Sequence, residues 1–383
     1  MKKYVYLDHA ATTPLKKQVY KAMKPYLTKK YGNPSSIYTL GQINNEAITK
    51  ARNQVAQALN ANPEEIYFTG SGSEANNWAL RGIAYANKHK GNHIITSCIE
   101  HHSILNTCKQ LEQEGFQVTY LPVNERGRVE IKSLIEAITD KTILISIMMV
   151  NNEIGTIQSI MALCSIAKTH HILFHTDAVQ AMGDLSCNVK NLQVDLLSLS
   201  GHKFYGPKGV GALYIKKGTL ITPLINGGGQ ENNLRAGTEN VPAIVGLGEA
   251  IQLNSNSSFN KIIAIQKLRN YFIQQLKIHF PQAYINGSLT YRVSGNVNVT
   301  LPNIEATTVL LALNEKGIFA STGSACNTGS LTPSHVLLAI GLTPEQAFST
   351  IRFTLGEHNT KQEIDYTIKE LKKIYKKLIE GEY

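Results

Sequence analysis

Short apolar runs rich in β-branched residues alternate with segments of helical periodicity between about Glu64 and Ile215. The apolar runs are IYF, HIITS, VTYLPV, ILISIMMV, ILFHTD, LLSLS and GALYI. Helical patterns begin at Ser73 and Ser103, and others cover residues 131–138 and 160–168. Strands that alternate with helices usually form a largely parallel sheet with helices on both faces. The sequence therefore predicts an α/β fold.

The segment SILNTCKQLEQEG shows the helical pattern most clearly. Ser103 is a candidate N-cap, and Gly115 is placed to end the helix. Within this helix, one face carries the apolar residues Ile104, Cys108 and Leu111. We expect this helix to cover one face of the sheet.

The pattern changes at the polar stretch LNSNSSFN, residues 253–260, which interrupts a long helical region. A strand-like run, NVNVTL, and a closing helix follow it. Thr360 and Glu363 form a candidate capping box for the closing helix. Its buried stripe is expected at Ile364, Ile368, Leu371 and Leu378.

The composition is that of a globular protein, with 43% hydrophobic and 17% charged residues in a chain of 383. This length allows a large core and two domains. The net charge is +10, but the 38 basic residues are spread along the chain without a nucleic-acid-binding motif. We therefore expect no direct binding to nucleic acid.

Cysteine usage and hydropathy bear on the cellular compartment. Five scattered cysteines without a CxxC pair argue against a disulfide framework and a structural zinc site, and the sequence suggests no metal ligands. The N-terminal segment MKKYVYLDHAATTP lacks the apolar run of a secretory signal. The run ILISIMMV is too short to span a bilayer. We expect a soluble cytoplasmic protein that makes no membrane contact.

Polar residues suited to catalysis follow the ends of several predicted strands. They are Glu100–His102, Asn151–Glu153, Asp177 and His202–Lys203. In an open α/β sheet, ligands bind beyond the carboxyl ends of the strands. These residues are therefore candidates for one shared site.

The stretch TGSGSEANN, residues 69–77, follows a strand and opens a helix. Backbone amides and the Ser73 hydroxyl could hold a phosphate at the positive end of that helix. Helix starts favour such residues even without a ligand. The stretch matches neither of the common nucleotide-binding fingerprints, GxxxxGK[ST] and GxGxxG, so a nucleotide is not the expected ligand.

Asp177 and His101 each allow two interpretations. A carboxylate directly after an apolar run needs a cation, such as a protonated pyridine nitrogen, unless Asp177 simply caps a helix or turn. The imidazole of His101 could stack on an aromatic cofactor or be a structural side chain. Together with a phosphate site, these residues suggest a pyridine that carries a phosphate.

Lys203 supplies the remaining chemistry. It lies among glycines, Ser200 and His202 at the end of a buried strand, where desolvation would help its amine lose a proton and form a Schiff base with a carbonyl. The ligand that combines phosphate, pyridinium and aldehyde is pyridoxal 5′-phosphate.

Cys326 lies in the polar run FASTGSACNTGSLTPSHVL, residues 319–337. Structural cysteines are usually buried among apolar neighbours, whereas this thiol is placed to react on an exposed loop. The other four cysteines are expected to be structural.

At this point the chain resembles the cysteine desulfurases, a class-V aminotransferase family of pyridoxal-phosphate enzymes of fold type I. The similarity extends from about Tyr4 to the final helix, and the long cysteine loop is similar to the branch of NifS- and IscS-type enzymes. The motifs that carry it are YLDHAATTP, GNPSS, EHHSIL, VNNEIGTIQ, HTDAVQ, SGHKFYGPKGVGALY, GGGQENNLRAGTEN, STGSAC and IRFTLG.

The resemblance implies an architecture. A large cofactor-binding domain, residues 16–257, would contain a mainly parallel sheet of the seven-stranded type covered by helices. A smaller α+β domain, residues 1–15 and 258–383, would carry the catalytic cysteine loop.

The resemblance also implies roles around the cofactor ring. Lys203 would hold the cofactor covalently, Asp177 would keep the pyridine nitrogen protonated, His101 would stack on the ring and act in catalysis, and Gln180 would bind the ring oxygen. The implied phosphate ligands are Gly72, Ser73, Ser200, His202 and, from the other subunit of a homodimer, Thr238.

The implied substrate is L-cysteine, with its carboxylate held by Arg352 and by Asn152, which would also contact the cofactor. The products would be L-alanine and a persulfide on Cys326. The sulfur would pass to an acceptor protein, such as an iron–sulfur scaffold or a tRNA-thiolating enzyme. A selenocysteine lyase or related lyase on the same fold is an alternative, and a non-catalytic partner protein is another.

Overall fold

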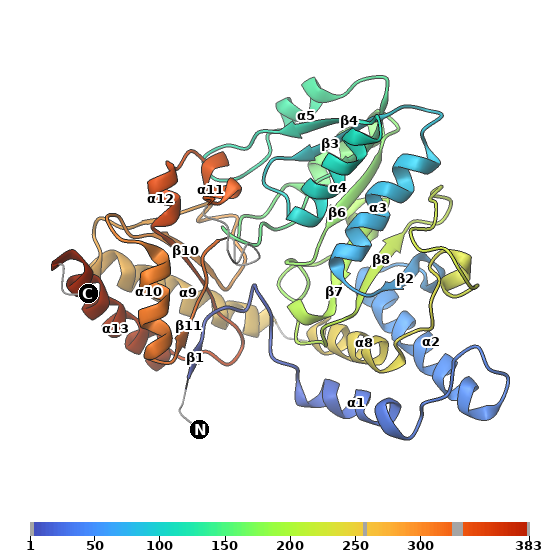
Figure 1. Ribbon diagram of the computed structural model, residues 1–383, viewed down its shortest axis with the longest axis horizontal. Coiled ribbons are helices and arrows are strands. Elements are labelled where there is room, and N and C mark those ends of the chain that lie inside the picture. Colours follow the sequence, from blue (N-terminus) through green and yellow to red (C-terminus); the bar gives the residue numbers. More distant parts are fainter. Residues whose placement is uncertain (1–3, 256–258, 324–331, 381–383) are drawn as a thin grey trace.

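The computed structural model describes residues 4–255, 259–323 and 332–380. A seven-stranded sheet forms the centre of the larger part, in the order β2-β8-β7-β6-β5-β3-β4 (Figure 1). Strand β8 is antiparallel to both neighbours, and the other pairings are parallel. This confirms the predicted, mainly parallel sheet. The strands are β2 (Ile66–Thr69), β3 (His93–Ser97), β4 (Gln117–Leu121), β5 (Thr142–Ser146), β6 (Leu173–Asp177), β7 (Leu196–Ser200) and β8 (Gly211–Ile215).

Helices cover both faces of this sheet, as predicted. On one face, α3 (Gly72–Ala86) and α4 (His102–Gln113) share a core with strand residues such as Ile94 and Leu213. A larger core lies on the other face and includes Phe174 and Leu199. The helices that contribute to it are α1 (Lys17–Thr28), α2 (Thr39–Leu59), α5 (Ile131–Ala137), α6 (Ile160–Thr169), α7 (Val189–Leu192) and α8 (Val241–Ser255).

The start of α4 differs from the prediction. Its N-cap is His101, whose Nδ1 accepts a hydrogen bond from the backbone N–H of Ser103 at 3.1 Å. The prediction of Ser103 as the cap is therefore wrong by two positions. Because a histidine nitrogen performs the usual task of the hydroxyl, the Ser103 hydroxyl is available to accept from Asn76 Nδ2 at 2.9 Å.

The second part of the chain forms two small sheets. Strands β9 (Tyr284–Ile285), β10 (Asn296–Thr300) and β12 (Thr350–Thr354) pair antiparallel, with β10 between the other two. Strand β1 (Val5–Tyr6) pairs parallel with β11 (Ile318–Phe319). A separate core joins these strands to α9 (Phe259–His279), α10 (Ala306–Glu315) and α13 (Lys361–Glu380). Strand β1 thus shares a core with helix α13, which is far away in the sequence.

Two short helices, α11 (His335–Ala339) and α12 (Pro344–Phe348), pack elsewhere. Their apolar residues join a cluster with Ile99, Met148 and Ile154, which follow strands of the large sheet. Consequently α11 rests on the large sheet's carboxyl edge.

The cores support the division predicted from the sequence, with residues 16–257 as one domain and 1–15 plus 258–383 as the other; we retain it as a proposal. Helix α8 ends at Ser255 and α9 begins at Phe259, which agrees with the predicted break in the long helical region. The capping box of α13 is also present, because Thr360 N donates to Glu363 Oε2 and Glu363 N donates to Thr360 Oγ1.

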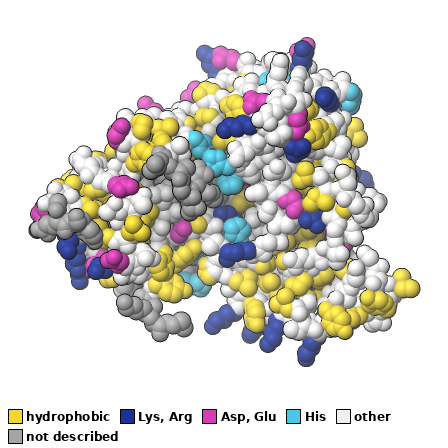
Figure 2. All heavy atoms as spheres, in the orientation of Figure 1, with side chains coloured by type: hydrophobic (Ala, Val, Ile, Leu, Met, Phe, Trp, Pro, Cys, Tyr) yellow, Lys and Arg dark blue, Asp and Glu magenta, His cyan; other side chains and the backbone are white. Residues whose placement is uncertain are grey.

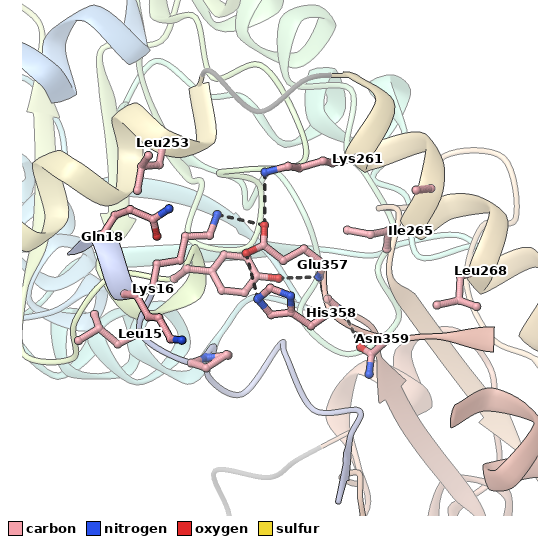
Figure 3. Close-up of a pocket in the computed structure, with 15 residues that line it drawn as sticks. Leu15, Lys16, Gln18, Leu253, Lys261, Ile265, Leu268, Glu357, His358 and Asn359 are labelled. Carbon is pink, nitrogen blue, oxygen red and sulfur yellow. Dashed lines mark hydrogen bonds and ion pairs between the residues drawn. The ribbon is translucent and has the colours of Figure 1, made fainter. Parts of the chain in front are cut away.

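A pocket of about 700 Å³ lies where these two parts meet (Figure 3). Leu15, Leu253 and Ile265 give it apolar walls. Inside it, Glu357 lies 3.1 Å from Lys16 Nζ and 3.7 Å from Lys261 Nζ. One partly buried carboxylate therefore binds cations from the segment before α1 and from α9.

Candidate active site

A second cavity, of about 360 Å³, opens at the carboxyl ends of β3, β6 and β7. It brings together most of the site residues predicted from the sequence. Those residues are Gly72, Ser73, His101, Asn152, Asp177, Gln180, Ser200, His202, Lys203 and Arg352. Thr238 is exposed and does not line the cavity. Cys326 lies outside the described residues.

The start of α3 forms one wall of this cavity. Ser71 caps the helix by accepting from Glu74 N at 3.1 Å, which leaves early backbone N–H groups directed at the cavity end. A Cβ added to Gly72 would lie 2.8 Å from Val179 Cγ2 and 3.1 Å from Ser200 Cβ. Glycine therefore allows the helix start to approach the end of β7. The result is a compact group of amides and hydroxyls suited to an anion.

Asp177 ends β6 and is buried. Its Oδ2 accepts from Asn76 Nδ2 at 2.7 Å and its Oδ1 accepts from Val179 N at 2.9 Å. These donors hold the carboxylate in one orientation inside the cavity. Asn76, which donates to this carboxylate, was not singled out from the sequence, although it lies within the quoted stretch TGSGSEANN.

The imidazole of His101 is held by a hydrogen bond to its Nδ1 atom. Nδ1 accepts from Ser103 N, so the neutral ring carries its proton on Nε2. Burial lowers the pKa of His101, and the nearby Asp177 opposes that effect. Burial also lowers the pKa of His202 to about 4. Both imidazoles are therefore neutral at pH 7.

Lys203 lies in the turn after β7 and reaches toward the N-terminal segment. Its Nζ donates to Ala10 O at 2.7 Å and to Ala11 O at 2.9 Å. Gln180 Nε2 donates to the same Ala10 carbonyl at 2.9 Å. The N-terminal segment thus positions both side chains that were predicted to contact the cofactor ring.

Arg352 enters the cavity from β12 and is 3% exposed. Its guanidinium donates to Asn152 O at 3.1 Å and to Asp8 Oδ1 at 3.0 Å. Its Nε is buried and has no hydrogen-bond partner among the described residues. Arginine in such a setting is well suited to bind a carboxylate. Asp8 was not identified from the sequence as a site residue.

Two further histidines line the cavity. The rings of His102 and His335 lie 4.9 Å apart, and His335 Nε2 donates to Glu100 O at 3.0 Å. On the face drawn in Figure 2, histidine side chains gather along the boundary between the two parts of the molecule. Sequence analysis had no signal for His335, because it follows the cysteine segment and not a strand.

Comparison with known proteins identifies the family. The model of the family Aminotransferase class-V matches residues 5–367. The chain belongs to the aminotransferase class-V family. Within that family, it is 54% identical over 376 residues to a cysteine desulfurase IscS of Methanosarcina thermophila, covering 98% of this chain and 93% of the relative. It is 52% identical over 378 residues to a cysteine desulfurase IscS of Dictyoglomus turgidum, covering 99% and 96%.

Similar solved structures give the same result. A NifS-like protein superposes with a TM-score of 0.93 at 38% identity, covering 98% of this chain and all of that one. SspA in complex with cysteine superposes with a TM-score of 0.83 at 40% identity, covering 93% of this chain and all of that one. The predicted fold and the resemblance to the cysteine desulfurases are confirmed.

The cofactor prediction is also confirmed, because class-V aminotransferases and the cysteine desulfurases among them depend on pyridoxal phosphate. The residues present fit each part of that molecule. The start of α3 with Ser200 suits the phosphate, the buried Asp177 suits the pyridinium, and Lys203 suits the aldehyde. No helix in the three described ranges is both long and apolar enough to cross a membrane.

Proposed function

We propose that this chain is a cysteine desulfurase that converts L-cysteine to L-alanine and keeps the sulfur as a persulfide on Cys326. The observation that supports it best is the single cavity that combines Asp177, Lys203 and Arg352. Its relatives named cysteine desulfurase IscS cover nearly the whole chain. An enzyme of this family needs each of these side chains for a different part of the substrate or cofactor.

The cofactor would be held at both ends. Its phosphate would be bound by Gly72, Ser73, Ser200 and His202, and by Thr238 of the partner subunit. Its ring would be contacted by Asp177, Gln180 and His101. Asn152 would bind both cofactor and substrate. When bound, pyridoxal phosphate supplies an electron sink that makes the substrate Cα proton acidic.

Arg352 would bind the carboxylate of L-cysteine, since a buried guanidinium with an unpartnered Nε can donate to it. The Lys203 amine would then remove the Cα proton at Nζ, because it is held at the same cavity by the Ala10 and Ala11 carbonyls. The neutral His101, which carries its proton on Nε2, is placed to donate it within the cavity.

The sulfur transfer is a nucleophilic displacement. The Cys326 thiolate attacks the substrate sulfur, so a sulfur–sulfur bond forms as the Cβ–S bond breaks. The electron pair of that bond remains with the carbon fragment, which takes up a proton and leaves as alanine. A reducing acceptor later removes the outer sulfur from Cys326.

We also propose a homodimer and a sulfur-acceptor protein as partners. Thr238 is exposed and outside the cavity of its own chain, which supports a role in the site of a second subunit. The larger part, to which Thr238 belongs, also exposes apolar side chains, as expected at a subunit interface. Ile37 is 92% exposed and Tyr31 is 75% exposed. The proposed acceptor is an iron–sulfur scaffold or a tRNA-thiolating enzyme, and the expected compartment is the cytoplasm.

The test measures alanine and sulfide from L-cysteine, together with the visible spectrum, for the wild type and Cys326→Ala. We expect a yellow wild type that makes both products, and a yellow variant that makes no sulfide. A variant as active as the wild type would favour the selenocysteine lyase or related lyase, which releases its product without a thiol. A colourless, inactive wild type would favour a non-catalytic partner protein.

A further inference from the structure

Glu153 is a buried acid that the proposed reaction does not use. It lies in the turn after Val150, is 3% exposed and lines the active-site cavity. Burial raises its pKa, an effect opposed by the hydrogen bond from Ser334 and by Arg352. A carboxyl group is costly to bury unless its partners require it there, so its contacts indicate its role.

The carboxyl group of Glu153 contacts both described ends of the segment that carries Cys326. On one side, Ser334 Oγ donates to Glu153 Oε2 at 2.5 Å. On the other, Gly323 packs so closely that a Cβ at this position would collide with Glu153 Oε2. Residues 324–333 lie between Gly323 and Ser334, so one side chain contacts the chain immediately before the segment that carries Cys326 and shortly after it.

Ser334 links Glu153 to helix α11. Its hydroxyl donates to Glu153 and at the same time accepts from Leu337 N at 3.2 Å as the helix N-cap. The next residue, His335, is fixed by its hydrogen bond to Glu100 O. The second end of the cysteine segment is therefore attached to the large sheet's carboxyl edge.

The backbone of Glu153 is equally constrained. Its N–H donates to Asn151 Oδ1 at 2.9 Å, and its carbonyl accepts from Asn296 Nδ2 at 2.9 Å and Asn298 Nδ2 at 3.2 Å. The preceding carbonyl, of Asn152, accepts from Arg352. The same turn thus contacts the residue that would bind the substrate carboxylate and the ends of the segment that would deliver the thiol.

We propose that Glu153 is a positioning residue that sets where Cys326 meets the substrate sulfur, by holding Gly323 and Ser334 on either side of its carboxyl group. This inference rests on the proposed function. It predicts that loss of the contact slows sulfur transfer to Cys326 and leaves the earlier binding of L-cysteine unchanged.

The experiment separates these two steps in the holoenzyme. The change in the visible spectrum on mixing with L-cysteine reports substrate binding, and alkylation of the Cys326 persulfide in a single turnover reports sulfur transfer. For Glu153→Ala we expect persulfide formation about tenfold slower, since the hydrogen bond with Ser334 is lost, with the spectral change within twofold of the wild type.

Two further variants test positioning against a chemical role. Glu153→Gln keeps an oxygen that can accept from Ser334, so it should recover persulfide formation to within about threefold of the wild type. Ser334→Ala should slow it partially, and the double variant with Glu153→Ala should be no slower than Glu153→Ala alone. Ser349→Ala changes a serine of similar burial away from Glu153 and should have no effect.

The opposite results would overturn the inference. For Glu153→Ala, these would be an equal loss in substrate binding and in persulfide formation, or no loss in either. A Glu153→Gln variant as slow as Glu153→Ala would also contradict the inference, and so would fully additive effects of Glu153→Ala and Ser334→Ala on persulfide formation. A wild type that forms alanine and persulfide keeps the proposed function intact in each of these cases. A wild type that forms neither contradicts the proposed function first, and this inference with it.

Discussion

Arg352 Nη2 lies 3.0 Å from Asp8 Oδ1, so the side chain that we expect to bind the substrate carboxylate already has an acidic partner. Burial raises the pKa of Asp8, and the charge and hydrogen bond of Arg352 lower it. An incoming carboxylate must share the guanidinium with Asp8 and with the Asn152 carbonyl. This arrangement predicts opposite effects for two substitutions.

Arg352→Lys should raise the KM for L-cysteine by about 10- to 100-fold, because a lysine ammonium cannot reproduce the planar fork. Steady-state kinetics at constant pH would measure it. A KM within twofold of the wild type would show that another group binds the carboxylate.

Asp8→Asn should instead lower the KM, by about threefold, because it removes a competing negative charge and keeps a hydrogen-bond acceptor for Arg352. The same assay applies. If the KM rises, Asp8 acts mainly by orienting Arg352 and its charge does not compete with the substrate.

Asp177→Asn should leave the cofactor bound but reduce kcat by about 100-fold, because a neutral amide cannot stabilise a cation beside it. The absorbance of the purified variant measures cofactor content, and alanine formation measures turnover. Asn76→Ala removes a donor to Asp177 but leaves the charge, so its loss should be smaller. Equal losses in the two variants would mean that orientation matters more than charge.

The buried His175 should make the fold sensitive to acid. Its ring lies between Ser146 Oγ and Ser198 Oγ, and burial lowers its pKa from 6.5 to about 3. As the pH falls below 6.5, the imidazole is protonated in the unfolded chain but not in the folded one. The stability that is present above pH 6.5 is therefore lost as the pH falls. One such group costs up to about 1.4 kcal/mol per pH unit.

Urea unfolding at pH values from 7 to 5 measures this effect. His175→Asn should reduce the pH dependence of the unfolding free energy, whatever its effect at pH 7. The same substitution at the exposed His89 should leave the slope unchanged. An unchanged slope for His175→Asn would show that other groups cause the acid sensitivity.

Glu357→Gln should lower the free energy of unfolding by about 1–2 kcal/mol, because Glu357 and Lys16 are 13% and 11% exposed and bind each other at 3.1 Å. Thermal unfolding would show it. Lys132→Gln breaks the exposed pair with Glu136 and should change the midpoint little. Similar shifts in the two variants would contradict the structural role of Glu357.

Much of the site could be predicted because parallel strands bring their carboxyl ends together. Asp177, His101 and Lys203 each follow an apolar run, so topology alone places them at one edge. Asp8 and Asn76 could not be found in this way, because their roles depend on partners far away in the chain. Glu153 was placed at this edge by the sequence, but its contact with Ser334 was not predictable for the same reason. Asp8 meets Arg352 across 344 positions, and Glu153 meets Ser334 across 181.

The helix boundaries show the same limit on a smaller scale. Periodicity predicted the extent of α4 closely, but the cap was assigned to Ser103 because serine is the usual residue. In the structure, the imidazole of His101 takes that position. Local preference therefore failed at a residue that also lines the active-site cavity.

The pairing of β1 with β11 has a consequence for biosynthesis. Val5 pairs with Ile318, and Ala10 N donates to Thr354 Oγ1, so the segment that contacts Lys203 is synthesised long before its partners. The large sheet can form during translation, whereas the active-site cavity is completed only after Arg352 has been synthesised. A nascent chain stalled before residue 318 should therefore be unable to retain the cofactor.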